Sequence, residues 1–179
     1  MALFETGPGD LSLWLQEKVI FIRKVIQFFM FILIVSLFGC SKNPINDDDV
    51  LELLKVYKKE QYTIEEPSDP PTEDEIVQRI KTYLSTEALE ELSANRVFSI
   101  APDIASHTNK PVKVNDVQIK ELEKNEDGTA DYTYTVEIQL GEGANAEIIK
   151  NNGQLTVSSE DGLKIIRDWE EKDHFKKFY

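Results

Sequence analysis

Few side chains in this sequence are suited to acid–base or nucleophilic chemistry near neutral pH. The chain has one cysteine, Cys40, and two histidines, His107 and His174. His107 follows Asp103 by four residues, a spacing at which the pair could bind a metal ion or share a proton. No third ligand or nucleophile accompanies the pair, so we interpret both as solvated loop residues. The sequence therefore predicts neither a catalytic site nor a metal site.

The acidic triplet Asp47-Asp48-Asp49 is a second group that could bind a cation. No further oxygen ligands follow it at the spacing of a calcium-binding loop. Carboxylates at the first turn of a helix complement the helix dipole and can cap its free backbone N–H groups. We therefore expect the triplet to begin a helix.

Composition limits the kinds of partner that this chain can have. It contains 33 acidic and 20 basic residues, which gives a formal net charge of −13. Nucleic-acid binding requires a basic face, so we expect no nucleic-acid partner. The sequence has no phosphate-binding loop and no Cys/His metal spacing, and we expect no cofactor. Residues 48–179 are enough for a single domain with its own core.

The segment Arg23–Cys40, RKVIQFFMFILIVSLFGC, has the pattern of a secretory signal peptide. Two cations precede the run Val25–Phe38, in which only Gln27 and Ser36 are not apolar. A basic region, an apolar region of about 7 to 15 residues and a small residue at the cleavage point define such a peptide. The pattern therefore predicts that the domain is exported.

The apolar run has an alternative interpretation as an uncleaved transmembrane anchor, Val19–Phe38, because about 20 apolar residues can span a bilayer. Arg23 and Lys24 interrupt that span, which favours the signal peptide. The preceding residues, Met1–Lys18, include carboxylates where a signal peptide should be basic, so the true start could lie just after them. Both interpretations of the run place the rest of the chain outside the cytoplasm, because the cations come first.

The end of the run, Leu37-Phe38-Gly39-Cys40, resembles the lipobox of bacterial lipoproteins. The resemblance implies that the Cys40 thiol receives a diacylglycerol, that the chain is cut before this cysteine, and that the domain stays on the outer face of the cell membrane. A lone cysteine in an exported protein has no disulfide partner, and two acyl chains suffice for stable anchoring. We therefore expect residues 1–39 to be an extension and signal peptide, and residues 40–47 a tether.

Helical spacing dominates the first part of the expected domain, residues 48–179. Apolar residues from Val50 to Tyr57 predict a helix over Asp48–Tyr62, with Lys58 and Lys59 near its end, where cations are favoured. Two further helices are expected to begin after the N-caps Thr72 and Ser85, and Thr72 and Glu75 have the spacing of a capping box. Residues 95–110 show no clean period, and Pro102 is expected to break any helix there.

From Pro111 onward the apolar residues alternate, which predicts strands. The first strand changes phase at Asn115-Asp116, where we expect a bulge. The clearest strand is Ala130–Leu140, with one apolar and one polar face. Three turns are expected between the strands, at Asn125–Gly128, Gly141–Asn145 and Glu160–Gly162.

The last two strands are less regular. The third, Ala146–Ser158, is expected to be interrupted by a bulge or turn at Asn151–Gly153. In the fourth, Leu163–Trp169, alternation places Ile165 and Trp169 on the same face. Helices followed by an antiparallel meander give an α+β layout.

The helical block Asp48–Ala94, the long strand from Ala130 and the ending GQLTVSSEDGLKIIRDW resemble the NTF2-like (cystatin-like) domains of small exported lipoproteins of Gram-positive bacteria. The resemblance implies a cone in which N-terminal helices pack on one face of a curved antiparallel sheet of about four strands. Enzymes of this superfamily place a carboxylate and a Tyr or His inside the cone. Tyr132, Tyr134 and Asp131 would be the candidates, but Asp131 alternates away from the tyrosines, which are also explained as core aromatics.

Three functions remain open, since this fold serves many. The first is a non-enzymatic, membrane-anchored lipoprotein that binds a protein or another envelope component. The second is a small-molecule binder whose pocket is lined by Tyr132, Tyr134 and Ile138. The third is an accessory component of a secretion or conjugation apparatus, which the NTF2-like resemblance alone suggests.

Overall fold

A computed structural model describes residues 44–178, and the structural statements below concern this range. The expected lipobox, Leu37-Phe38-Gly39-Cys40, lies outside the described residues. Among residues 44–178, no helix has the length and apolar character needed to cross a membrane.

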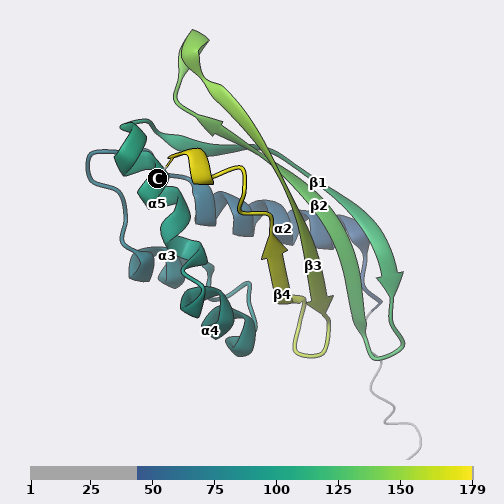
Figure 1. Cartoon of the computed structure of the whole chain (residues 1–179). Helices are drawn as coiled ribbons and strands as arrows, with labels where there is room; N and C mark the ends of the chain where they lie inside the picture. The colour runs from purple at the N-terminus through teal and green to yellow at the C-terminus, as the bar shows by residue number, and fades with distance from the viewer. Residues whose placement is uncertain (1–43, 179) are drawn as a thin grey trace, which may run out of the picture. The chain divides into compact units, whose positions relative to one another are not determined.

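The described part of the chain begins with four α-helices and continues as a four-stranded antiparallel sheet (Figure 1). The helices are α2 (Asp47–Tyr62), α3 (Glu73–Ile80), α4 (Thr86–Ala94) and α5 (Ile100–Thr108), with a short 3₁₀ turn, η1 (Val97–Ser99), before α5. The strands are β1 (Val112–Lys124), β2 (Thr129–Leu140), β3 (Glu147–Ser158) and β4 (Lys164–Glu170). Two further 3₁₀ turns are η2 (Gly143–Asn145) and η3 (Lys176–Phe178). The predicted α+β fold, with helices on one face of a curved sheet, is confirmed.

The helix starts follow the predicted capping chemistry. Thr72 and Glu75 form the capping box of α3, and the Ser85 side chain accepts the backbone N–H of Ala88 at the start of α4. At α2 the acidic triplet occupies the first turn, as expected, but the cap itself is Asn46, whose side chain accepts the N–H of Asp48. The signals at helix starts were therefore readable from sequence to within one residue.

The expectation that Pro102 excludes a helix is wrong. Pro102 is the third residue of α5, within the first turn. Backbone N–H groups of the first turn have no partner inside the helix, so a residue without an N–H costs no hydrogen bond there. The helix ends at Thr108, and the capping residue Asn109 takes a left-handed conformation with φ 51°.

The sheet is a meander in the order β1-β2-β3-β4, with every neighbouring pair antiparallel. β1 has a register shift between Val114 and Asp116, which confirms the predicted bulge. Along β2 the apolar side chains point inward without interruption, as predicted. The inward residues are Ala130, Tyr132, Tyr134, Val136, Ile138 and Leu140.

The interruption predicted at Asn151–Gly153 is absent, because β3 pairs continuously with β2 through this segment. Asn151 and Gly153 both face the helices and are buried. They resemble turn residues in sequence, but each is required by a side chain of the core, as described below. Polar and small residues inside a strand were thus mistaken for a break.

The expectation that Ile165 and Trp169 share a face is also wrong. A register shift in the β3–β4 pairing, where Val157 pairs with Ile165 and Thr156 with Arg167, adds one residue to β4. Ile165 therefore points inward, while Trp169 points outward and is 50% exposed. The same shift turns the two acidic neighbours of Trp169 toward the helices.

Candidate functional site

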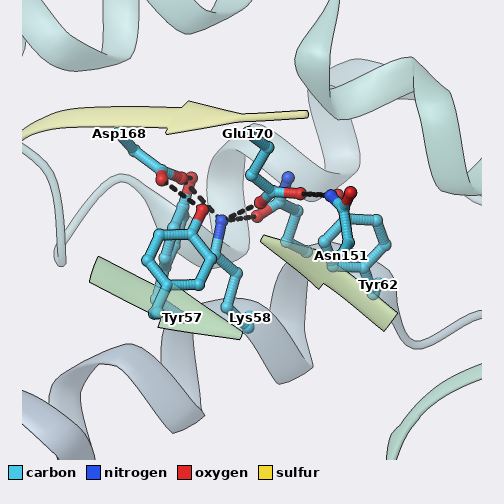
Figure 2. A network of polar contacts seen from close by, with 8 residues as sticks. Tyr57, Lys58, Tyr62, Asn151, Asp168 and Glu170 are labelled. Atoms are coloured by element: carbon cyan, nitrogen blue, oxygen red, sulfur yellow. Dashed lines mark hydrogen bonds and ion pairs between the residues drawn. The ribbon is translucent and has the colours of Figure 1, made fainter. Parts of the chain in front are cut away.

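Lys58 lies at the centre of a buried polar network between α2 and β4. It follows Leu54 by four residues on the stripe of α2 that faces the sheet, and its side chain is fully buried. Its ammonium group contacts two carboxylates of β4, with Nζ 2.6 Å from Oδ2 of Asp168 and also in contact with Oε1 of Glu170 (Figure 2). Asp168 and Glu170 are two residues apart, so they project from the same face of the strand.

Asp168 receives two tyrosine hydroxyls in addition to Lys58. The hydroxyl of Tyr57 donates to Oδ2 at 3.0 Å, and that of Tyr134 donates to Oδ1 at 2.6 Å. The two rings also flank the ammonium group of Lys58, with their centroids 4.7 and 4.9 Å from Nζ. The cation is therefore enclosed by both carboxylate oxygens and aromatic faces.

Glu170 is held by a separate set of donors. The Tyr62 hydroxyl donates to its Oε2 at 2.5 Å, and Nδ2 of Asn151 donates to the same oxygen at 2.6 Å. Gln61 contacts Lys58 instead, and its Oε1 accepts a hydrogen bond from Nζ of Lys58 at 3.1 Å. The eight side chains, called the Lys58 network below, are Tyr57, Lys58, Gln61, Tyr62, Tyr134, Asn151, Asp168 and Glu170.

Gly153 allows Tyr134 to reach Asp168. It pairs with Tyr134 across β2 and β3 and faces the same side of the sheet. A Cβ atom at this position would overlap the end of the Tyr134 ring and would lie 2.6 Å from the carbonyl oxygen of Trp169. The position therefore requires glycine for close approach rather than for an unusual backbone angle.

Burial and charge act against each other in setting the pKa values of the network. Burial lowers the pKa of Lys58, but the two adjacent carboxylates outweigh this effect and raise it above its usual value. For Glu170, Lys58 and the hydrogen-bond donors outweigh burial, so its pKa is lowered. For Asp168 burial prevails and the pKa is raised. The ammonium therefore stays charged at neutral pH, and Asp168 is the carboxyl that takes up a proton more readily.

The three tyrosines of the network keep their protons. Burial, followed by the neighbouring carboxylates, raises the pKa values of Tyr57, Tyr62 and Tyr134 well above the usual value. Each hydroxyl can therefore act as a donor to a carboxylate throughout the physiological range. None of them has the lowered pKa that a tyrosine acting as a base would need.

The Lys58 network is closed to substrates. A cavity of about 20 Å³ is lined by Tyr62, Asp168, Glu170 and Phe175, among others, and the Phe175 and Tyr62 rings stack with their centroids 6.0 Å apart. This volume is enough for roughly one water molecule. Gln61 Nε2 and Asn151 Oδ1 are buried without a hydrogen-bond partner in the described range. Among residues 44–178 no cluster of His, Cys, Asp and Glu could hold a metal ion.

The residues expected to line a pocket are all in the core, but their hydroxyls go to different places. Tyr132 donates to Oδ1 of Asp47 at 3.0 Å, and burial raises its pKa to about 12. Tyr134 belongs to the Lys58 network, and Ile138 is 1% exposed. None of the three lines the cavity at Phe175. A pocket formed by these three side chains stays a prediction.

The other candidates lie apart from the network. Asp131 faces away from the tyrosines, on the outer face of the sheet, where Oδ1 accepts a hydrogen bond from Thr156 at 2.6 Å. His107 is exposed on α5 and its Nδ1 is 2.9 Å from the carbonyl oxygen of Asp103, so the two side chains do not form the pair considered above. His174 lies 3.5 Å from Glu171 at the surface.

The sequence interpretation missed Lys58, Asp168 and Glu170 as a unit. One signal was present, because Lys58 continues the spacing of Val50 and Leu54 on the buried stripe of α2. It was assigned instead to the helix end, where cations are common. The two carboxylates gave no comparable signal, since simple alternation from Ile165 places them on the solvent side.

Comparison with known proteins gives similarity in structure only. No family model and no curated protein sequence matches the chain. The periplasmic domain of DotI matches with 11% identity and a TM-score of 0.53, over 74% of this chain and 99% of that domain. An IcmL-like type IV secretion system protein from Legionella pneumophila matches with 9% identity and a TM-score of 0.51, over 72% and 94%.

A protein described as NTF2-like and involved in plasmid conjugation matches less well, with 9% identity and a TM-score of 0.45, over 70% of this chain and 48% of that one. Identities this low establish the fold and do not transfer a function. The described domain has the α+β fold expected from the sequence, with helices on one face of a four-stranded antiparallel sheet, and it shares this fold with the DotI and IcmL-like structures.

Proposed function

We propose that this protein is a non-enzymatic accessory component of a type IV secretion or conjugation apparatus, and that its domain acts outside the cytoplasm through contacts with other proteins. The observation that carries the proposal is the closed interior. Where an NTF2-like enzyme would need an open cone, this domain places an ion-paired lysine whose neighbours fill the space. A domain whose interior has no room for a substrate acts through its surface.

The choice of apparatus is supported by the fold. Two structures that match with TM-scores above 0.5 are described as a type IV secretion system protein and as a periplasmic domain, and the match extends over nearly all of each. The small-molecule pocket at Tyr132, Tyr134 and Ile138 has less support, because these side chains are packed in the core.

We further propose that the protein is a lipoprotein of a Gram-positive bacterium, anchored through a diacylglycerol on Cys40 after cleavage at Leu37-Phe38-Gly39. The support is the apolar run followed by the only cysteine of the chain. Helix α2 begins at Asp47, and seven residues span at most about 25 Å when extended. This tether would keep the domain close to the outer surface of the membrane.

The test is photo-crosslinking of the full-length chain in the source bacterium. A photoreactive amino acid is placed at exposed positions, such as Ile148 and Lys113, and at the buried position Val136 as a control. We expect the exposed positions to capture secretion or conjugation components and Val136 to capture none. Capture of no envelope protein, or turnover of a small molecule by the purified protein, would overturn the proposal.

Anchoring is tested separately by the intact mass of the membrane-extracted protein beside a Cys40→Ala variant. A mass that begins at a diacylated Cys40 is expected for the native chain and not for the variant. A mass that retains the residues before Cys40 would indicate a transmembrane anchor instead.

A further inference from the structure

The outer face of the sheet, opposite the helices, carries a shallow trough of about 440 Å³. Its centre is formed by two short side chains of β2, Thr133 and Thr135, which are flanked by longer side chains on β1 and on β3 and β4. The trough therefore forms because short side chains on the central strand lie between longer side chains on the neighbouring strands. The flanking residues are Gln118, Lys120, Asn152, Gln154, Trp169 and Glu171.

Trp169 forms the aromatic wall of the trough. It pairs with Gln154 across β3 and β4, and Gln154 in turn pairs with Thr133 of β2. The register shift at the start of β4 points the indole outward, where half of it remains exposed. A large apolar ring that a strand exposes beside polar neighbours is available for contact with a ligand.

The polar groups around this ring have unused hydrogen-bonding capacity. Neither the amide of Gln154 nor the indole N–H of Trp169 forms a hydrogen bond within residues 44–178. Asn152 is positioned by the Thr135 hydroxyl, which donates to its Oδ1 at 2.9 Å, and its Nδ2 donates to Oε2 of Glu171 at 3.5 Å. Planar amides and hydroxyls side by side can each donate and accept.

The trough is close to electrically neutral although the chain has a net charge of −13. Lys120 and Glu171 are the only charged residues among those that line it, and they have opposite signs. Such a surface offers no electrostatic selection for a strongly charged ligand. The two strands at its centre, β2 and β3, offer no free edge to a peptide, because both pair with neighbours on each side along this segment.

We propose that this trough binds a neutral glycan chain. A sugar ring presents apolar C–H groups on its faces and hydroxyls around its rim. The C–H face would stack on the indole of Trp169, while the rim hydroxyls would bond to the amides of Gln154 and Asn152 and to the central threonines. The inference shares with the proposed function only the location outside the cytoplasm, where cell-wall glycans are accessible.

The test is titration of the full-length protein, solubilised in a zwitterionic detergent without a sugar headgroup, with a soluble tetramer of β-1,4-linked N-acetylglucosamine. Binding is measured by calorimetry, and purified cell-wall sacculi are used in a parallel sedimentation assay. We expect saturable binding that Trp169→Ala weakens by about tenfold or more, and Gln154→Ala by several-fold. Trp169→Phe should retain part of the affinity, because it keeps an aromatic face.

The matched control is Ile148→Ala. Ile148 is an exposed apolar residue, 45% exposed on the same strand as Gln154, but it does not line the trough. It should leave binding unchanged. Circular dichroism melting curves establish that each variant is folded.

Absence of saturable binding to both the tetramer and the sacculi would overturn the inference. Binding that Trp169→Ala leaves intact would overturn it as well. The proposed role in a secretion apparatus is judged by the crosslinked partners alone, so either proposal can fail while the other stands.

Discussion

The two faces of β4 have opposite chemical character, although their residues alternate along one strand. Asp168 and Glu170 point inward, where each carboxylate is surrounded by donors and by the ammonium of Lys58. Trp169, between them, points outward with half of its surface exposed, and its indole N–H has no hydrogen-bond partner among residues 44–178. The two carboxylates are therefore buried, whereas the large apolar side chain between them is exposed to solvent. Charged residues are usually exposed and large apolar residues usually buried, and β4 shows the reverse. We attribute this to the partner of each face: α2 on the inside and, by our inference, a ligand on the outside.

Lys58→Met, which removes the cation from the inner face of β4, should have the largest effect on stability. The change leaves two carboxylates in the core without their cation, and removing one partner of a buried ion pair destabilises proteins by about 3–5 kcal/mol. We expect a loss of this size in the free energy of unfolding, measured by urea denaturation. The control is Lys59→Met, the adjacent exposed lysine, which should change stability by less than about 0.5 kcal/mol. Equal stability of the two variants would show that the network does not hold α2 against β4.

Gly153→Ala should have the next largest effect. The added methyl group overlaps Tyr134 and approaches the backbone of β4, and overpacking of this kind costs about 1–3 kcal/mol. Thermal unfolding followed by circular dichroism measures the loss. In a Tyr134→Ala background one of the two obstructions is absent, so the same change should have a smaller effect. An equal effect in both backgrounds would contradict the role assigned to Gly153.

Alkaline pH should weaken the inner face selectively. The pKa of Lys58 is raised in the folded state, so its contribution to stability is complete below the unfolded value, near 10.5, and is lost as the pH rises through the folded value. The raised pKa values of Tyr57, Tyr62 and Tyr134 act in the same direction above their usual value of 10.0. We expect the free energy of unfolding to fall above about pH 10, and to fall less steeply in Tyr57→Phe. A curve that is flat from pH 9.5 to 11.5 would disprove this coupling.

The smallest effect on stability is expected from Trp169→Ala, on the outer face. Because the indole is half exposed and has no hydrogen bond among the described residues, its loss should change the free energy of unfolding by no more than about 1 kcal/mol. The same substitution should nevertheless remove most of the glycan affinity. A large loss of stability would indicate that Trp169 serves the fold, and that its exposure has another cause.

Much of the scaffold was predictable because its determinants are local. The capping box at Thr72 and Glu75, the turn at Asn125–Gly128 and the alternation of β2 each depend on residues within one element. The signal-peptide and lipobox predictions also use a local pattern, and they remain predictions because those residues lie outside the described range. Local patterns therefore gave the layers of the domain and their order.

The Lys58 network was not predictable in this way. Lys58 and Asp168 are separated by 110 residues, and their meeting depends on one register shift that moves the phase of β4 by a single position. Asn151 and Gly153 were interpreted as a break in β3, because both are common in turns. Their roles depend on residues of other strands: Asn151 donates a hydrogen bond to Glu170, and Gly153 leaves space for the Tyr134 ring. The role of each of these residues depends on the register between strands and not on the local sequence pattern.

The distance in sequence between Lys58 and its carboxylates also bears on when the domain can finish folding. A chain that leaves a ribosome or a translocation channel N-terminus first exposes α2 long before β4. Until β4 arrives, Lys58 has no carboxylate partner with which it could be buried. An ammonium group without a partner resists burial, so the unfinished intermediate keeps α2 hydrated instead of locking it against an incomplete sheet. Under the export proposed above, the buried charge would delay compaction of the domain until β4 has also crossed the membrane.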